Sequence, residues 1–257
     1  MVDPRTLILS KVLDQLGFET VPRSTVLTRL NQIQPDGETA LLDSAKAGIN
    51  VVLKLNEVFN QLGASGAWNF VHIVITDGID TVSNSSIEEL AMLFALVGRG
   101  IPKDKCLTVF IGVELSVEAA IQLALLTKLG GDTCQMYNVN SVQLNDIFAR
   151  ISATIGVRRQ VNINMINTNG VSAMAFQQTN QPYLNITRKN FAVLLNLDIS
   201  GSMNGGRFNS LKSSVQSFLR NLDQNDLVSC LVFNERVQLL KNYQPRPQIR
   251  EIRCATQ

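Results

Sequence analysis

The sequence is poor in charge, in aromatic residues and in histidine. Charged residues make up 17% of the 257 positions and aromatic residues 6%, and His72 is the only histidine. With 23 Lys and Arg against 21 Asp and Glu, the formal net charge is only +2. This balance gives no reason to expect nucleic acid or an anionic membrane surface as a partner. The apolar fraction of 45% excludes a disordered chain.

Long apolar runs and paired cysteine motifs are also lacking. No run approaches the roughly 20 residues of a membrane-spanning helix. The first segment places Asp3 and Asp14 around a broken apolar pattern, which is not typical of a secretory signal. The four cysteines form no CxxC motif, so we expect reduced, largely buried thiols. These features predict an intracellular, cytoplasmic protein.

Buried strands alternate with amphipathic helices along much of the chain. Continuous apolar runs predict strands at 70–76, 106–113, 133–139, 191–197 and 227–233. Apolar residues at helical spacing predict helices at 3–17, 25–33, 39–62, 87–97, 117–129, 142–155 and 208–222. Residues 237–240 read as an antiparallel neighbour of the last strand. This alternation predicts an α/β protein with a Rossmann-like, doubly wound, mostly parallel sheet flanked by helices.

The α/β pattern is interrupted, and this interruption divides the chain into regions. Residues 1–24 are predicted to form an N-terminal helical extension. Residues 25–156 and 191–257 carry the α/β pattern. Residues 157–190 are polar and rich in asparagine, and they contain the hairpin signal Thr168-Asn169-Gly170. We therefore interpret residues 157–190 as a linker with a small hairpin.

Two of the predicted strands end in an aspartate. VHIVITD ends at Asp77, and AVLLNLD ends at Asp198. The carboxyl ends of parallel strands form the ligand crevice of a doubly wound sheet, so both carboxylates are expected to face it. A single aspartate in this place is more often a helix N-cap, which is the simpler alternative for either one.

Hydroxyl side chains follow Asp198 at alternate positions. Ser200 and Ser202 lie in a loop that Gly201 allows to turn tightly. Carboxylate and hydroxyl oxygens suit a hard cation such as Mg²⁺ or Mn²⁺, whereas Ca²⁺ prefers more ligands. The serines could instead cap the following helix.

The segment DISGS at 198–202 resembles the metal-ion-dependent adhesion site of von Willebrand factor type A domains. That family adds a threonine in a GTAL-like segment and an aspartate in a strand-end TDG. Here GETALL supplies Thr39, with one extra residue after the glycine, and Thr76-Asp77-Gly78 supplies the aspartate. The resemblance covers about residues 25–156 and 191–240. It implies a metal site made of Asp198, Ser200, Ser202, Thr39 and Asp77.

The order of the motifs departs from the family. There the DxSxS strand comes first, whereas here Thr39 and Asp77 precede Asp198. Residues 25–156 thus resemble the second half of such a domain, and residues 191–257 its first half. Three explanations stay open: a circular permutant closed within one chain, a fragment of a tandem array, or a homodimer that exchanges halves.

The resemblance implies a protein-binding module rather than an enzyme. Mg²⁺, or Mn²⁺ or Ca²⁺ in its place, would bridge the site to an acidic side chain of a protein partner. The alternatives are a metal-free structural or interaction domain, a fragment of a tandem protein, and a metal-dependent hydrolase. Against an enzyme, His72 lies in an apolar strand and is expected to be a satisfied core residue. No GxSxG, GxxxxGK[ST], GxGxxG or HExxH motif occurs. The run NGGR at 204–207 is more typical of a hydrated turn than of a phosphate loop.

Overall fold

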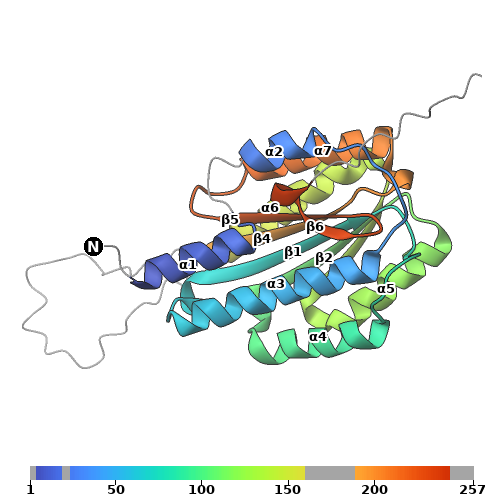
Figure 1. The fold of residues 1–257 in the computed structure, drawn as a ribbon. Helices are drawn as coiled ribbons and strands as arrows, with labels where there is room; N and C mark the ends of the chain where they lie inside the picture. The colour runs from blue at the N-terminus through green and yellow to red at the C-terminus, as the bar shows by residue number, and fades with distance from the viewer. Residues whose placement is uncertain (1–3, 19–23, 160–188, 244–257) are drawn as a thin grey trace, which may run out of the picture.

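A six-stranded sheet runs through the centre of the molecule (Figure 1). The computed structural model describes residues 4–18, 24–159 and 189–243. The strands are ordered β3-β2-β1-β4-β5-β6, and all neighbours are parallel except the antiparallel pair β5 and β6. Their bounds are β1 (Trp68–Thr76), β2 (Cys106–Val113), β3 (Cys134–Val139), β4 (Asn190–Asp198), β5 (Leu227–Phe233) and β6 (Val237–Leu239).

Helices cover both faces of the sheet, as Figure 1 shows. Helices α3, α4 and α5 pack on one face, and α2, α6 and α7 pack on the other. The helices are α1 (Pro4–Gln15), α2 (Ser24–Leu30), α3 (Leu41–Gln61), α4 (Ile87–Gly100), α5 (Val117–Gly130), α6 (Leu144–Arg159) and α7 (Gly206–Arg220). The predicted α/β class, with a mostly parallel sheet flanked by helices, is confirmed.

The core has two layers because the central strands are buried on both faces. Successive side chains of a strand point to opposite faces. In β1, Ile73 and Ile75 pack with the α6 and α7 layer, whereas Phe70 and Val74 pack with the α3 layer. Burying one such side chain contributes about 1.5–3 kcal/mol. This explains why continuous apolar runs, rather than alternating ones, marked these strands in the sequence.

The two α/β regions of the chain share this sheet instead of forming two. Strands β1 and β4 pair in parallel from Trp68 opposite Asn190 to Ile75 opposite Leu197. From β1 the chain continues to β2, and from β4 it continues to β5, on the other side. The strand order therefore reverses between β1 and β4. In open α/β sheets, the carboxyl edge at such a reversal is the usual position of a ligand site.

The end of α6 and the start of β4 lie next to each other. The Arg159 guanidinium carbon is 5.2 Å from the centre of the Phe191 ring. Arg159 Nη2 also lies 2.5 Å from Oδ2 of the buried Asp226, and the Phe191 backbone N–H donates to Asp226 Oδ1 at 2.9 Å. Helix α6 runs past its predicted end at 155. Its last two residues bond other parts of the chain: Arg158 donates to the Cys106 carbonyl at the start of β2, and Arg159 donates to Asp226. The predicted hairpin within 157–190 lies outside the described residues.

Helix α1 packs against the β5–β6 end of the sheet. Leu9 and Leu13 contact the α3 layer of the core. Ser229 Oγ donates to the Leu16 carbonyl at 2.7 Å, and Lys241 Nζ bonds the Asp14 carboxylate at 3.0 Å. None of the described helices is long and apolar enough to cross a membrane.

The predicted buried thiols are confirmed for three of the four cysteines. Cys106, Cys134 and Cys230 are free and buried, and burial raises the pKa of the Cys106 thiol to about 12. Cys254 lies outside the described residues. His72 is buried as predicted. Neither ring nitrogen has a hydrogen bond of standard geometry among the described residues, but the Asn196 side chain interacts with the ring and raises its pKa against the larger effect of burial. Burial lowers its pKa to about 4.

Candidate metal site

The five residues predicted to hold a metal come together at the carboxyl edge of the sheet. Asp198 ends β4, and Asp77 directly follows the end of β1. Ser200 and Ser202 lie in the loop between β4 and α7, and Thr39 lies two residues before α3. The hydrogen bonds described below join these three parts of the chain where the strand order reverses.

Asp198 is a fully buried carboxylate held by two donors. Thr76 Oγ1 donates to Asp198 Oδ2 at 2.6 Å, and the Ser200 backbone N–H donates to Oδ1 at 2.8 Å. Burial, with a smaller contribution from the nearby charge of Asp77, raises the pKa of Asp198 to about 6, although the hydrogen bonds from Thr76 and Ser200 act in the opposite direction. No cationic side chain of the described residues forms an ion pair with Asp198. It is therefore a fixed, desolvated carboxylate without a counter-charge.

The two serine hydroxyls continue from Asp198 toward Asp77. Ser200 Oγ and Ser202 Oγ are 3.0 Å apart, and Ser202 Oγ donates to Asp77 Oδ1 at 2.7 Å. Neither serine caps a helix through its side chain, because the N-cap of α7 is Gly205 and Ser200 makes no capping bond. The capping alternative is thus wrong for both serines. Their hydroxyls face each other and the second carboxylate.

Thr39 approaches the same group of oxygens beside Gly78. A Cβ atom added at Gly78 would lie 3.3 Å from Thr39 Oγ1 and 3.9 Å from Ser202 Oγ. Two loops fix the Thr39 segment. The Thr39 backbone N–H donates to Thr81 Oγ1 at 3.1 Å, and the Gly201 N–H donates to the Gly37 carbonyl at 2.9 Å. The segment is therefore tied to the loop after β1 and to the loop after β4.

Arg207 reaches into the site, which the sequence did not indicate. Its Nη1 lies 2.7 Å from Asp77 Oδ2, and its Nε lies 2.8 Å from Glu114 Oε2. Glu114 follows β2 with a positive φ of 55°, and Ser141 Oγ also donates to it at 2.9 Å. The Arg207 guanidinium, with help from Ser141, lowers the pKa of Glu114 to about 2. The NGGR run turns into α7, and its arginine pairs with Asp77 and Glu114.

The available donors fit a hard divalent cation. The group contains two carboxylates and three hydroxyls, and oxygen ligands of this kind suit Mg²⁺. Nowhere in the described residues do three His, Cys, Asp or Glu side chains gather as a metal-binding group. A site at this edge would consequently depend on hydroxyl ligands. The buried Asp198 carboxylate has no ion-pair partner among the described residues, so its negative charge would attract a cation to this place.

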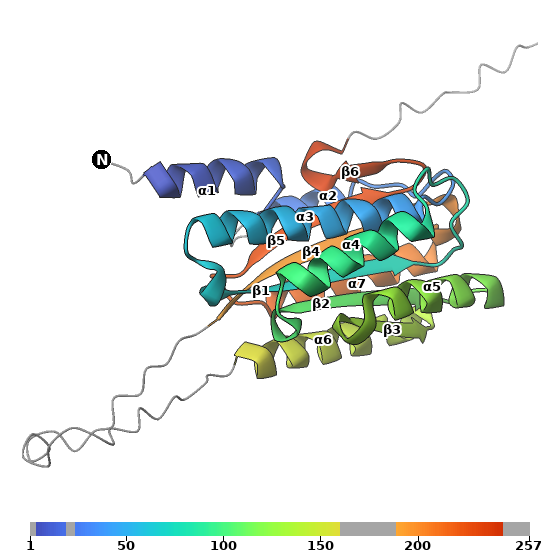
Figure 2. The same ribbon diagram turned by 90° about the horizontal axis from the view of Figure 1, so that it is seen from below.

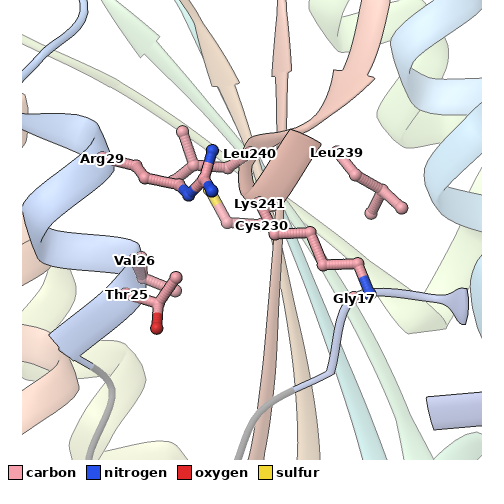
Figure 3. A pocket seen from close by; sticks show the side chains of 8 residues that line it. All are labelled: Gly17, Thr25, Val26, Arg29, Cys230, Leu239, Leu240 and Lys241. Atoms are coloured by element: carbon pink, nitrogen blue, oxygen red, sulfur yellow. The ribbon is translucent and has the colours of Figure 1, made fainter. Parts of the chain in front are cut away.

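Two hollows on the described surface differ in size and place. The pocket in Figure 3 has a volume of about 10 Å³, enough for roughly one water molecule. Its lining is Gly17, Thr25, Val26, Arg29, Cys230, Leu239, Leu240 and Lys241. A groove of about 400 Å³ adjoins the loop that carries Ser202, and its lining includes Pro35, Asn204 and Lys212. The larger hollow lies between residues 33–35 and the start of α7, and none of the five candidate ligands lines it.

Comparisons with known proteins give a distant structural likeness. No protein-family model matches the chain, and no curated protein matches it. Among solved structures, the chain is similar to an uncharacterized protein from Alicyclobacillus acidocaldarius, with 18% sequence identity and a TM-score of 0.41. That likeness covers 68% of this chain and 79% of the other. It carries no argument about what the chain binds.

Proposed function

We propose that this chain is a divalent-metal-dependent protein-binding module, similar to von Willebrand factor type A domains with their halves in permuted order. The observation that carries the proposal is the 2.7 Å hydrogen bond from Ser202 Oγ to Asp77 Oδ1. This bond joins the DxSxS loop to the TDG loop across 125 positions of the chain. Two motifs that are far apart in the sequence, and in reversed order, contribute to one cluster of oxygens.

The sheet order supports closure of the permuted halves within one chain. Strand β4, which carries the DxSxS motif, pairs directly with β1, which carries the TDG motif. The contacts of Arg159 with Phe191 and Asp226 bring the end of α6 beside the start of β4, which supports a short connection between the two regions. A homodimer that exchanges halves would use the same contacts between chains, so the mass of the folded protein distinguishes the two arrangements.

The five candidate ligands are of two kinds. Asp198 and Asp77 provide charge, whereas Ser200, Ser202 and Thr39 provide neutral oxygens. When bound, the metal would supply an electrophilic position that a carboxylate of a protein partner can fill. Thr76 and the Ser200 backbone N–H keep Asp198 in one orientation before any metal arrives. Such supporting hydrogen bonds commonly strengthen a metal site.

A metal-free interaction module is the second candidate, and Arg207 is the observation that favours it. The guanidinium already neutralises Asp77 and bridges it to Glu114. With this cation in place, the carboxyl edge can persist as a closed network of hydrogen bonds. The two candidates differ in whether partner binding requires added metal.

Binding to acidic peptides, with and without metal, tests the proposal. The chain is stripped of metal and applied to peptides that contain one Asp, each paired with the same peptide carrying Asn. We expect retention only for the Asp peptides and only with Mg²⁺, and we expect Ser202→Ala to abolish it. Asp132→Ala is the matched control, because Asp132 is exposed and lies before β3, at the opposite edge of the sheet. Equal binding with EDTA would favour the metal-free module, and equal binding of Asp and Asn peptides would contradict carboxylate recognition.

A further inference from the structure

Arg207 is the cation that borders the five candidate ligands. Its Nη1 lies 2.7 Å from Asp77 Oδ2 and donates to the Ser202 carbonyl at 3.2 Å, so the guanidinium contacts both motif loops. No other ion pair within the described part of the chain involves a candidate ligand. A carboxylate of a protein partner that reaches a metal at these ligands would therefore arrive beside this guanidinium.

Two carboxylates hold the Arg207 guanidinium in place. Strands β1 and β2 run side by side in parallel (Figure 2), so Asp77 and Glu114, which follow them, lie at the same edge of the sheet. Arg207 Nε lies 2.8 Å from Glu114 Oε2, and Ser141 Oγ donates to Glu114 at 2.9 Å. Glu114 is also the only non-glycine among the described residues with a positive φ, and strained backbone of this kind clusters at functional sites. The guanidinium is thus oriented before any protein partner binds.

One nitrogen of the guanidinium remains unused. Arginine has five N–H donors, and the contacts with Glu114, Asp77 and Ser202 use three of them. The other two belong to Nη2, which has no hydrogen-bond partner among the described residues and is not one of their buried polar atoms. The Arg207 side chain is 33% exposed. Its free donors can therefore bind a carboxylate, and such charge-assisted bonds are roughly twice as strong as neutral ones.

The charges around Arg207 explain why both a metal and the arginine would be needed. Hydrogen bonds through the two serines connect Asp198 to Asp77, and Arg207 connects Asp77 to Glu114. Three carboxylates in this network face one guanidinium, so two negative charges stay uncompensated and would repel an acidic side chain. A divalent cation would balance them. With the metal but without Arg207, one negative charge would remain.

We propose that Arg207 is a specificity-determining residue, whose Nη2 donates to the carboxylate of a protein partner that binds at the metal. The inference rests on the proposed function and names the residue that distinguishes an acidic side chain from its amide. A carboxylate offers acceptors to both the metal and the guanidinium. An Asn or Gln side chain has only one oxygen, and its NH₂ group would face the N–H donors of Arg207.

Two titrations of the full chain test this assignment, one with MgCl₂ alone and one with an Asp peptide at saturating Mg²⁺. For Arg207→Ala we expect tighter binding of Mg²⁺, because a positive charge is lost, but about ten- to a hundredfold weaker binding of the Asp peptide. A general loss of structure would not shift the two affinities in opposite directions. Arg207→Lys keeps the charge but has fewer donors, so the peptide should bind more weakly while the affinity for Mg²⁺ stays near that of the wild type.

Lys212→Ala is the matched control for a lost positive charge on α7. Lys212 Nζ lies 5.1 Å from the centre of the Phe208 ring, and Lys212 forms no ion pair with the described residues, so both affinities should stay unchanged. Wild-type peptide affinity in Arg207→Ala would overturn the role of Arg207 and leave the metal-dependent module intact. Peptide binding that requires Arg207 but not Mg²⁺ would support Arg207 and contradict the metal. A wild type that binds no Asp peptide, or binds Asp and Asn peptides equally, would overturn both.

Discussion

The end of β1 and the end of β4 each present an aspartate, but the two carboxylates have opposite surroundings. Asp77 pairs with the Arg207 guanidinium at 2.7 Å. Asp198 is fully buried and accepts only neutral donors, which leaves its pKa raised to about 6. One strand end is thus compensated by the chain itself, whereas the other keeps a charge for which the described residues provide no cation.

In both cases the completing group comes from the other half of the chain. Thr76, from the half with Asp77, donates to Asp198, and both Arg207 and Ser202, from the half with Asp198, contact Asp77. Neither strand end would have this environment alone. The difference between the two carboxylates therefore depends on the pairing of β1 with β4, which we call the β1–β4 seam.

The largest effect is expected where the two halves are tied together at the amino edge of the sheet. Asp226 has no exposed side-chain surface and receives Arg159 and the Phe191 N–H. Asp226→Ala removes one partner of a buried ion pair, so it should lower the free energy of unfolding by about 3–5 kcal/mol. Urea denaturation measures this. Asp132→Ala, which breaks the exposed pair with Lys103, should change it by less than about 1 kcal/mol. An equal loss of unfolding free energy in both variants would show that the contacts of Asp226 with Arg159 and Phe191 do not hold the two regions together.

The pH dependence of stability should separate the two sides of the seam. Asp198 has a folded pKa of about 6 instead of 3.8, so its contribution is present at low pH and is lost as the pH rises to 6. His72 has a folded pKa of about 4 instead of 6.5, so its contribution is present above pH 6.5 and is lost as the pH falls to 4. Each shift corresponds to about 3 kcal/mol, and in the wild type the two slopes oppose each other.

Substitutions should expose each slope separately. In EDTA, the free energy of unfolding of Asp198→Asn should rise between pH 4 and 6.5, because only the His72 contribution remains. That of His72→Leu should fall between pH 4 and 6, because only the Asp198 contribution remains. Urea titrations across this range measure both, and the difference between the variants cancels the titration of all other groups. Parallel curves for the two variants would show that these surroundings do not set the pKa values.

A smaller effect is expected where α3 crosses the seam. Gly48 lies against His72 of β1 and Asn196 of β4, and a Cβ added there would be 2.1 Å from His72 Nε2. Gly48→Ala should therefore destabilise the chain by about 1–3 kcal/mol through overpacking. Gly98→Ala is the control, because nothing lies within 4 Å of a Cβ at that helical position. It should stabilise the chain by about 0.5–1 kcal/mol. Thermal unfolding of both variants measures the contrast, which would be absent if α3 did not pack closely here.

The smallest effect is expected on the affinity for Mg²⁺ when Arg207 is replaced. Arg207→Ala removes a positive charge from the edge of the proposed metal site, so we expect Mg²⁺ to bind roughly two- to tenfold more tightly. Arg207→Lys keeps the charge and should leave the affinity near that of the wild type. Isothermal titration with MgCl₂ measures both. Weaker binding by Arg207→Ala would mean that the guanidinium mainly orients Asp77 and Glu114.

The sequence predicts the α/β class and the mostly parallel sheet because most of its strands are continuous apolar runs. The predicted bounds of β2 and β5 match the structure, since both are continuous apolar runs with turn residues at their ends. Asp77, Asp198, Ser200 and Ser202 meet at one edge, as their positions after strands imply. Thr39 lies before α3 and was indicated only by the family resemblance. The strand positions are predictable because a strand that is buried on both faces is a continuous apolar run in the sequence.

Contacts between distant residues could not be predicted in the same way. Arg207 and Glu114 are 93 positions apart, and no local pattern links the first turn of α7 to the residue after β2. Likewise, His72 looked like an ordinary core residue, and only the structure shows Gly48 and Asn196 beside it. The extension of α6 beyond 155 depends on acceptors in other elements.

Thermal unfolding with and without Mg²⁺ tests most directly whether the two halves build one metal site. At 100 times its dissociation constant, a ligand bound only by the folded chain adds about 2.7 kcal/mol. We predict this stabilisation for the wild type and for Asp132→Ala, and its loss in both Asp77→Ala and Asp198→Ala, one variant from each half. Stabilisation that survives in either of these variants, or that is absent from the wild type, would contradict the shared site.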